Sequence, residues 1–132
     1  MPIVNSGVML DTNVVIRHLR NATSLLEKLS AFSELFLPLP VLAELYSGAF
    51  RSARPDRKLR EIDIFSQATT FAAPDEKTAF LYGEISARLA KKGNPIPQND
   101  IWIAALALQF DLPLATADDH FSKVDGLEVL LW

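Results

Sequence analysis

The sequence contains no cysteine, and this absence removes several classes of function at once. Without thiols there are no disulfides, no zinc–thiolate sites and no thiol nucleophile, so oxygen atoms remain as the expected ligands for a metal ion. No apolar run approaches the roughly 18 residues of a membrane-spanning helix. Polar residues also interrupt the start of the chain, where a signal peptide would need an apolar core. We therefore expect a cytoplasmic protein.

Length and composition predict one domain, residues 1–132, with a sizeable core, because 49% of the chain is apolar. The net charge of −3 argues weakly against a protein that binds nucleic acid over its whole surface. Positive charge is concentrated between positions 51 and 60, in Arg51, Arg54, Arg57, Lys58 and Arg60. Such a cluster is typical either of a solvated helix face or of a surface that contacts phosphates.

The stretch from Val8 to Ile16 is the feature around which the sequence is organised. Val8 to Leu10 form an apolar run without alternation, which predicts a strand buried on both faces of a parallel sheet. Asn13 is a good helix N-cap, so Asp11 is expected in a tight turn between strand and helix, where open α/β sheets bind ligands. A plain turn or capping aspartate remains the alternative.

Strands and helices alternate along the rest of the chain. We expect strands at 8–10, 34–37, 69–71, 113–116 and 127–131, and helices at 14–19, 24–29, 41–50, 56–67, 74–92 and 99–109. Asn21 or Thr23 is the expected cap of the second helix. This order predicts an α/β fold, a doubly wound parallel β-sheet with helices on both faces.

Four acids stand where an ordinary surface acid is not expected: Asp11, Glu44, Asp100 and Asp118. Asp11 and Asp118 follow strand ends, Glu44 lies on or beside the inward face of its helix, and Asp100 begins an apolar helix whose dipole favours the ionised carboxylate. Each has an ordinary explanation as a turn, solvated or first-turn acid. Together at one sheet edge they require a counter-ion, and carboxylates without histidine or cysteine nearby suit Mg²⁺ or Mn²⁺.

Such a metal site predicts the hydrolysis of phosphodiester bonds. A divalent ion lowers the pKa of a bound water and neutralises the charge that develops on the phosphate. Thr12, Asn13 and Thr116 flank two of the acids with hydroxyl and amide groups that are able to hold metal-bound water. We expect these three residues to support the site.

Four short signatures follow one another along the chain: Leu10 to Asn13, Glu44, Asp100 to Ala105, and Thr116 to Phe121. Their combination resembles the PIN-domain ribonucleases, specifically the VapC-like toxins of bacterial toxin–antitoxin pairs, from about Val8 to the C-terminus. The resemblance implies a PIN-like α/β/α sandwich and a Mg²⁺-dependent endoribonuclease, with Mn²⁺ as a possible substitute. It also implies that Asp11, Glu44, Asp100 and Asp118 are its catalytic and metal-binding acids.

The same resemblance guides the choice between neighbouring residues. Asp118 is preferred to Asp119 as the fourth acid because the family pattern has threonine, any residue, then the acid, and Thr116 matches that threonine. Asp119 is expected to cap the following turn. His120 and His18 are interpreted as surface or packing residues.

The resemblance further implies partners. Toxins of this type bind a small VapB-like antitoxin whose C-terminal segment lies across the acidic site, and they form homodimers that assemble further with it. Apolar helix residues that either contact this partner or belong to the core are Leu45, Tyr46, Phe50, Leu59 and Phe65. Basic residues expected to hold RNA phosphates are Arg54, Arg57, Lys58 and Arg60.

Three other functions fit the sequence less well than a ribonuclease. A receiver-type Mg²⁺-binding signalling domain needs an acidic pair after its first strand and a lysine after its last, and this chain has only Asp11 and no such lysine. A haloacid-dehalogenase-type phosphatase needs a second aspartate where Asn13 stands. A non-catalytic, RNA-binding PIN-like module is disfavoured because all four acids are present. The sequence does not identify the RNA or decide between one and two metal ions.

Overall fold

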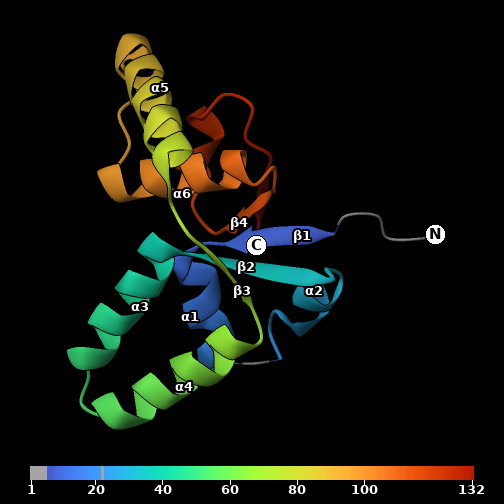
Figure 1. The fold of residues 1–132 in the computed structure, drawn as a ribbon. Helices are drawn as coiled ribbons and strands as arrows, with labels where there is room; N and C mark the ends of the chain where they lie inside the picture. The colour runs from blue at the N-terminus through green and yellow to red at the C-terminus, as the bar shows by residue number, and fades with distance from the viewer. Residues whose placement is uncertain (1–5, 22) are drawn as a thin grey trace.

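The computed structural model describes residues 6–21 and 23–132. Its centre is a five-stranded parallel sheet in the order β3-β2-β1-β4-β5, which confirms the predicted doubly wound topology (Figure 1). The strands are β1 (Gly7–Leu10), β2 (Glu34–Pro38), β3 (Thr70–Ala72), β4 (Leu114–Thr116) and β5 (Val129–Leu131).

Helices lie on both sides of the sheet, as right-handed crossover connections require. One group is α1 (Thr12–Arg20), α2 (Leu26–Ser30), α3 (Leu39–Phe50) and α4 (Pro55–Gln67). The other is α5 (Glu76–Lys92), α6 (Gln98–Gln109) and the short 3₁₀ helix η1 (Asp119–Lys123). Figure 1 shows the two groups on opposite sides of the strands. None of the described helices is both long and apolar enough to cross a membrane.

The middle of the sheet is where the chain reverses its direction of winding. β1 pairs with β2 on one side and with β4 on the other, with Met9 opposite Leu114 and Leu10 opposite Ala115. Val8, Met9 and Leu10 have no exposed surface, which confirms the strand covered on both faces. The carboxyl ends of β1 and β4 therefore border the crevice in which doubly wound sheets bind ligands.

Helix α6 has more buried residues than any other described helix, and they lie between Ile101 and Ala107. Ile103, Ala104, Ala105 and Ala107 have no exposed surface, and the small alanine side chains allow close packing against the sheet. Helix α5 packs on the outside of α6. This double support fixes the first turn of α6, which carries Asp100, relative to the ends of the strands.

Two predicted helix caps are wrong. Asp11, not Asn13, is the N-cap of α1, because β1 runs directly into the helix and the Asp11 carboxylate accepts the N–H of Thr12. Asn13 is an exposed residue of the first turn. Helix α2 begins only at Leu26 and has no side-chain cap, while Asn21 accepts hydrogen bonds from Thr23 instead.

Candidate active site

Asp11 is a nearly buried carboxylate, 6% exposed, at the end of the central strand. The backbone N–H of Thr12 donates to its Oδ1 at 2.8 Å, and the Thr116 hydroxyl donates to its Oδ2 at 2.7 Å. Burial raises the pKa of Asp11 above its ordinary value of 3.8, because these two hydrogen bonds compensate only partly for lost hydration. The negative charges of Asp100 and Glu44 raise this pKa further, because both carboxylates are close enough to Asp11 to repel it.

Thr116 joins the ends of the two central strands. Besides donating to Asp11, its buried hydroxyl accepts the backbone N–H of Asp118 at 3.0 Å. Asp118 then caps η1, because its Oδ1 accepts the N–H of His120 at 3.1 Å. One hydroxyl thus hydrogen-bonds both to the first predicted acid and to the backbone of the fourth.

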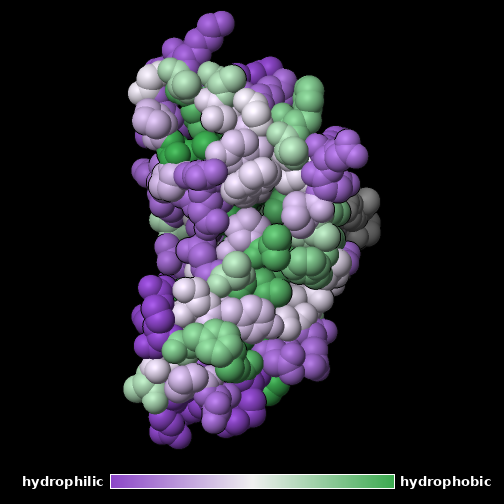
Figure 2. Space-filling view, turned by 60° about the vertical axis from the view of Figure 1, so that its left-hand side comes forward, coloured by the Kyte–Doolittle hydropathy of each residue, from purple (hydrophilic) through white to green (hydrophobic). Residues whose placement is uncertain are grey.

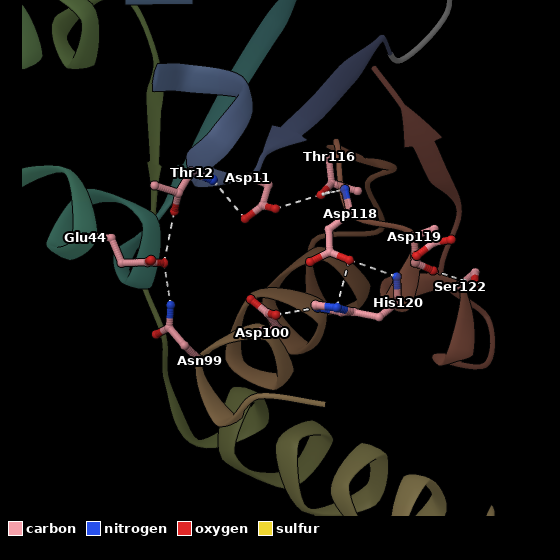
Figure 3. Close-up of polar contacts among 10 residues, drawn as sticks. All are labelled: Asp11, Thr12, Glu44, Asn99, Asp100, Thr116, Asp118, Asp119, His120 and Ser122. Carbon is pink, nitrogen blue, oxygen red and sulfur yellow. Dashed lines mark hydrogen bonds and ion pairs between the residues drawn. The ribbon is translucent and has the colours of Figure 1, made fainter. Parts of the chain in front are cut away.

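Glu44 reaches the site from α3. The residue itself is exposed, rather than on the inward face of the helix, but its carboxylate turns toward the Asp11 turn (Figure 3). The Thr12 hydroxyl donates to its Oε1 at 3.0 Å, and the Asn99 side-chain amide donates to the same oxygen. Asn99 was absent from the predicted site; its position next to Asp100 at the start of α6 is the one signal that pointed to it.

His120 was wrongly left out of the site. Its ring lies against Phe121, with centroids 5.2 Å apart, as expected of a packing residue. Both ring nitrogens nevertheless face carboxylates: Nε2 lies 2.5 Å from Asp100 Oδ2, and Nδ1 lies 2.7 Å from Asp118 Oδ1. The expectation of a carboxylate site without histidine nearby is therefore corrected, since His120 stands between the third and fourth acids (Figure 3).

Within the described residues, the group able to hold a metal ion consists of Asp100, Asp118 and His120, whose ligand atoms all lie within 4.8 Å of one another. Asp11 and Glu44 border this group at the same sheet edge (Figure 3). Donors of this kind fit a divalent cation of the Mg²⁺ to Mn²⁺ range.

Of the two adjacent aspartates, Asp118 is the one that faces the site. Asp119 is exposed, and its backbone carbonyl accepts a hydrogen bond from Ser122 at 2.7 Å. The expectation that Asp119 caps the following turn is wrong, because Asp118 occupies the N-cap position of η1.

Comparisons with known proteins agree with this geometry. The sequence profile of the PIN domain family matches residues 8–127. The chain belongs to the PIN-domain family. It is similar to ribonuclease VapC2 of Haemophilus influenzae, with 36% identity over 129 residues that cover 94% of this chain and 96% of that protein. It is also similar to the tRNA(fMet)-specific endonuclease VapC of Salmonella typhimurium, with 29% identity and the same coverage of both chains.

A solved structure extends the likeness to the fold. The chain superposes on the crystal structure of DNA-bound VapBC from Salmonella typhimurium with a TM-score of 0.89 and 28% identity, covering 96% of this chain and 98% of that one. Within the PIN-domain family the chain is thus a VapC-type ribonuclease toxin of a toxin–antitoxin system.

The basic residues of this VapC-type chain divide between two hollows. Lys58 lines a cleft between α1, α3 and α4 that also includes Glu44, whereas Arg54, Arg57 and Arg60 line a separate hollow around the start of α4. The Glu61 carboxylate forms ion pairs with both kinds of residue: its Oε2 lies 3.3 Å from Arg57 Nε, and its Oε1 lies 3.9 Å from Lys58 Nζ. Of the four residues predicted to contact RNA, Lys58 therefore shares a cleft with one of the acids, and the three arginines line a hollow that contains none of the four predicted acids.

The predicted antitoxin-contacting residues also divide. Leu45 is buried and belongs to the core, Tyr46, Leu59 and Phe65 are half-buried, and Phe50 is 68% exposed. Figure 2, which turns the α3 side of Figure 1 forward, shows hydrophobic side chains gathered in the middle of this face between hydrophilic margins.

His18 is a packing residue, as predicted. The centroid of its ring lies 5.5 Å from that of the Phe65 ring, and among the described residues its buried Nδ1 has no hydrogen-bond partner. Burial lowers the pKa of His18, so this ring favours its neutral form.

Proposed function

We propose that this VapC-type toxin is a Mg²⁺-dependent endoribonuclease in which Asp11, Glu44, Asp100 and Asp118 hold the metal and position the reacting phosphate. The supporting observation is the convergence of four carboxylates, from four different elements, at the point where the winding of the sheet reverses (Figure 3). This is the place in a doubly wound sheet where ligands bind.

The donor atoms of this edge fit a hard divalent cation. Asp11 is almost buried with a raised pKa, and within the described residues no lysine or arginine forms an ion pair with it, with Asp100 or with Asp118. Buried carboxylates in such a position need a positive partner, and carboxylate oxygens are the ligands that Mg²⁺ and Mn²⁺ prefer. When bound, the ion supplies an activated water and neutralises charge on the scissile phosphate.

The residues around the acids hold them in place for this task. Thr116 fixes Asp11 and the backbone of Asp118, while Thr12 and Asn99 both hold the Glu44 carboxylate. The first turns of α1 and α6 lie at the same edge, and their partial positive charges favour the approach of an RNA phosphate. Asn13 is exposed in the first turn of α1, where it is able to contact RNA, and we assign it no role in holding an acid.

The cleft between α1, α3 and α4 is the surface we assign to the antitoxin. Ile16, Leu19 and Ile62 give it apolar walls, and Glu44 stands at its end beside the acids. A VapB-like segment with an apolar stretch and one basic side chain has the matching chemistry. The solved relatives include VapBC complexes from Rickettsia felis and Haemophilus influenzae, which supports a partner of this kind. We further propose that the chain forms a homodimer and acts in the cytoplasm.

The RNA substrate is proposed only as a class. The Salmonella typhimurium relative is named as a tRNA(fMet)-specific endonuclease, which makes a structured tRNA the first substrate to try. Lys58, in the cleft with Glu44, is placed to contact a phosphate near the acids, and Arg54, Arg57 and Arg60 to contact one further away.

The experiment that tests this function compares two carboxylate variants in Mg²⁺ titrations of RNA cleavage. Asp100→Asn is expected to abolish metal-dependent cleavage while the circular dichroism spectrum stays unchanged. Asp119→Asn is the matched control, an exposed acid outside the site, and is expected to cleave like the unmodified chain. Equal cleavage by both variants would refute the proposed site.

A further inference from the structure

His120 is held more firmly than a surface histidine requires. It follows Asp118 in the first turn of η1, and its neighbour Phe121 is completely buried beneath the turn. The Asp118 carboxylate accepts the backbone N–H of His120 as well as facing ring atom Nδ1. The direction of the imidazole is therefore set by the cap, by the packing on Phe121 and by two carboxylates.

The two nitrogens have different surroundings. Nδ1 faces Asp118 Oδ1, from the residue that also caps the backbone, so the natural donor to Asp118 is the Nδ1–H group. The ring then presents the lone pair of Nε2 to Asp100 Oδ2, which lies 2.5 Å away. A lone pair and a carboxylate oxygen repel each other at this distance, so a positive charge has to stabilise the contact, either a proton on Nε2 or a metal ion bound by both atoms.

We propose that His120 is a metal ligand through Nε2, alongside Asp100, and that it gives the site a preference for Mn²⁺ over Mg²⁺. This inference rests on the proposed metal-dependent function. Ligating histidines commonly donate their second N–H to a carboxylate, which is the role that Asp118 Oδ1 has here, leaving Oδ2 of Asp118 free for the site.

The preference follows from the chemistry of the donor atoms. Mg²⁺ takes oxygen ligands and gives up its waters reluctantly, whereas imidazole nitrogen favours the transition metals. A site built of carboxylates alone discriminates weakly between Mg²⁺ and Mn²⁺. One nitrogen among the ligands strengthens the binding of Mn²⁺ selectively.

The test is pulsed EPR spectroscopy of Mn²⁺ bound to the full chain, which detects directly coordinated imidazole nitrogen without any RNA. The chain has two histidines, so the assignment is simple. We expect a ¹⁴N modulation from one ligand nitrogen in the unmodified chain, and its replacement by a ¹⁵N signal when histidine alone is labelled. The signal is expected to persist in His18→Gln and to vanish in His120→Gln.

Metal affinities, measured by EPR for Mn²⁺ and by competition for Mg²⁺, give a second readout. His120→Gln is expected to weaken Mn²⁺ binding by about tenfold, as the loss of a site partner does, and Mg²⁺ binding by less. Equal weakening of both ions would contradict a selective ligand. Because the isotope experiment uses the unmodified chain, the inference stays testable if His120→Gln fails to fold.

The outcomes also separate this inference from the proposed function. If Mn²⁺ binds, and Asp100→Asn abolishes that binding, but no histidine nitrogen is detected, His120 is only a hydrogen-bonding neighbour and the metal-dependent nuclease stands. If Mn²⁺ does not bind, or binds equally to Asp100→Asn, the proposed metal site and the His120 ligand fail together.

Discussion

Asp11 and Asp75 each cap an α-helix of this protein, and their surroundings are opposite. Asp75, the cap of α5, is exposed and accepts hydrogen bonds from two backbone N–H groups and from the Gln109 side chain. The hydrogen bond from Gln109, above all, lowers the pKa of Asp75. Asp11, the cap of α1, is nearly buried, and burial raises its pKa. The charged carboxylate is thus favoured at Asp75 and disfavoured by burial at Asp11, where the cation of the proposed metal site would compensate for the lost hydration.

The largest expected contrast between the two caps is in catalysis. Asp11→Asn should reduce Mg²⁺-dependent RNA cleavage by at least about 100-fold, because it removes a charge from the metal site. Asp75→Asn should leave cleavage unchanged, because Asp75 lies outside the acidic edge. Initial rates of cleavage at saturating Mg²⁺ measure both. Comparable losses in the two variants would remove the distinction between a structural and a functional cap.

The threonines that accompany the two caps allow a finer comparison. Thr116 donates to Asp11, and Thr78 accepts the backbone N–H of Asp75; both are fully buried. Replacement of either by valine should lower the free energy of unfolding by about 1–2 kcal/mol, the cost of a lost buried hydrogen bond. Thr116→Val alone should also weaken Mg²⁺ binding, by about tenfold. Denaturant unfolding and metal titration separate the two effects; equal metal binding in both variants would contradict the role of Thr116.

The pH dependence of stability should have opposite signs at the two caps. Asp11 has a raised pKa, so its contribution to the stability of the metal-free protein is fully present below its ordinary pKa of 3.8 and is lost as the pH rises through the raised value. Asp75 has a lowered pKa, so its contribution is present above 3.8 and is lost as the pH falls through the lowered value.

Melting temperatures between pH 3 and pH 7 test these signs in the absence of divalent ions. Asp11→Asn should melt a few degrees higher than the unmodified chain at pH 7, with the difference vanishing in acid. Asp75→Asn should melt lower at pH 7, again with the difference shrinking in acid. Differences of the same sign in both variants would contradict the electrostatic contrast.

The smallest expected effects concern the basic residues, which lie away from both caps. Lys58→Gln should reduce the slope of log affinity for RNA against log salt concentration by about one, if Lys58 contacts one phosphate. Arg57→Gln, at the neighbouring position but in the separate hollow, tests the proposed contact with the more distant phosphate in the same way. Catalytically inactive Asp100→Asn protein allows binding to be measured without cleavage. An unchanged slope for Lys58→Gln would favour the solvated helix face.

Sequence patterns predicted the fold well where burial alone determines structure. The apolar run Val8 to Leu10 predicted a covered strand, and the alternation of strands and helices predicted a doubly wound parallel sheet, whereas the order of the strands came from the structure. The cap of α1 was mispredicted because Asp11 and Asn13 are both good caps, and the choice depends on where the strand ends. The cap of α2 was mispredicted because the helix begins later than expected, at Leu26.

The candidate site was predictable for residues that follow strand ends and was not for residues that depend on tertiary contacts. Asp11 and Asp118 were predicted to lie close together because parallel strands bring their carboxyl ends to one edge, whereas Glu44 and Asp100 were chosen from their positions on helices and from the family resemblance. His120 and Asn99 were missed because their partners lie far along the chain: Asp100 is 20 positions from His120, and Glu44 is 55 positions from Asn99. No local spacing encodes these distances; they arise from how α3, α6 and η1 pack around the sheet.

Because the Asp11 carboxylate at the end of β1 is poorly hydrated, the melting temperature of the protein should report the binding of cations beside it. Because the fold carries an electrostatic penalty there until a positive ion arrives, each ion that enters should raise the melting temperature in proportion to how well it matches the acids. A heating curve would then rank candidate cations before any nucleic acid target has been identified.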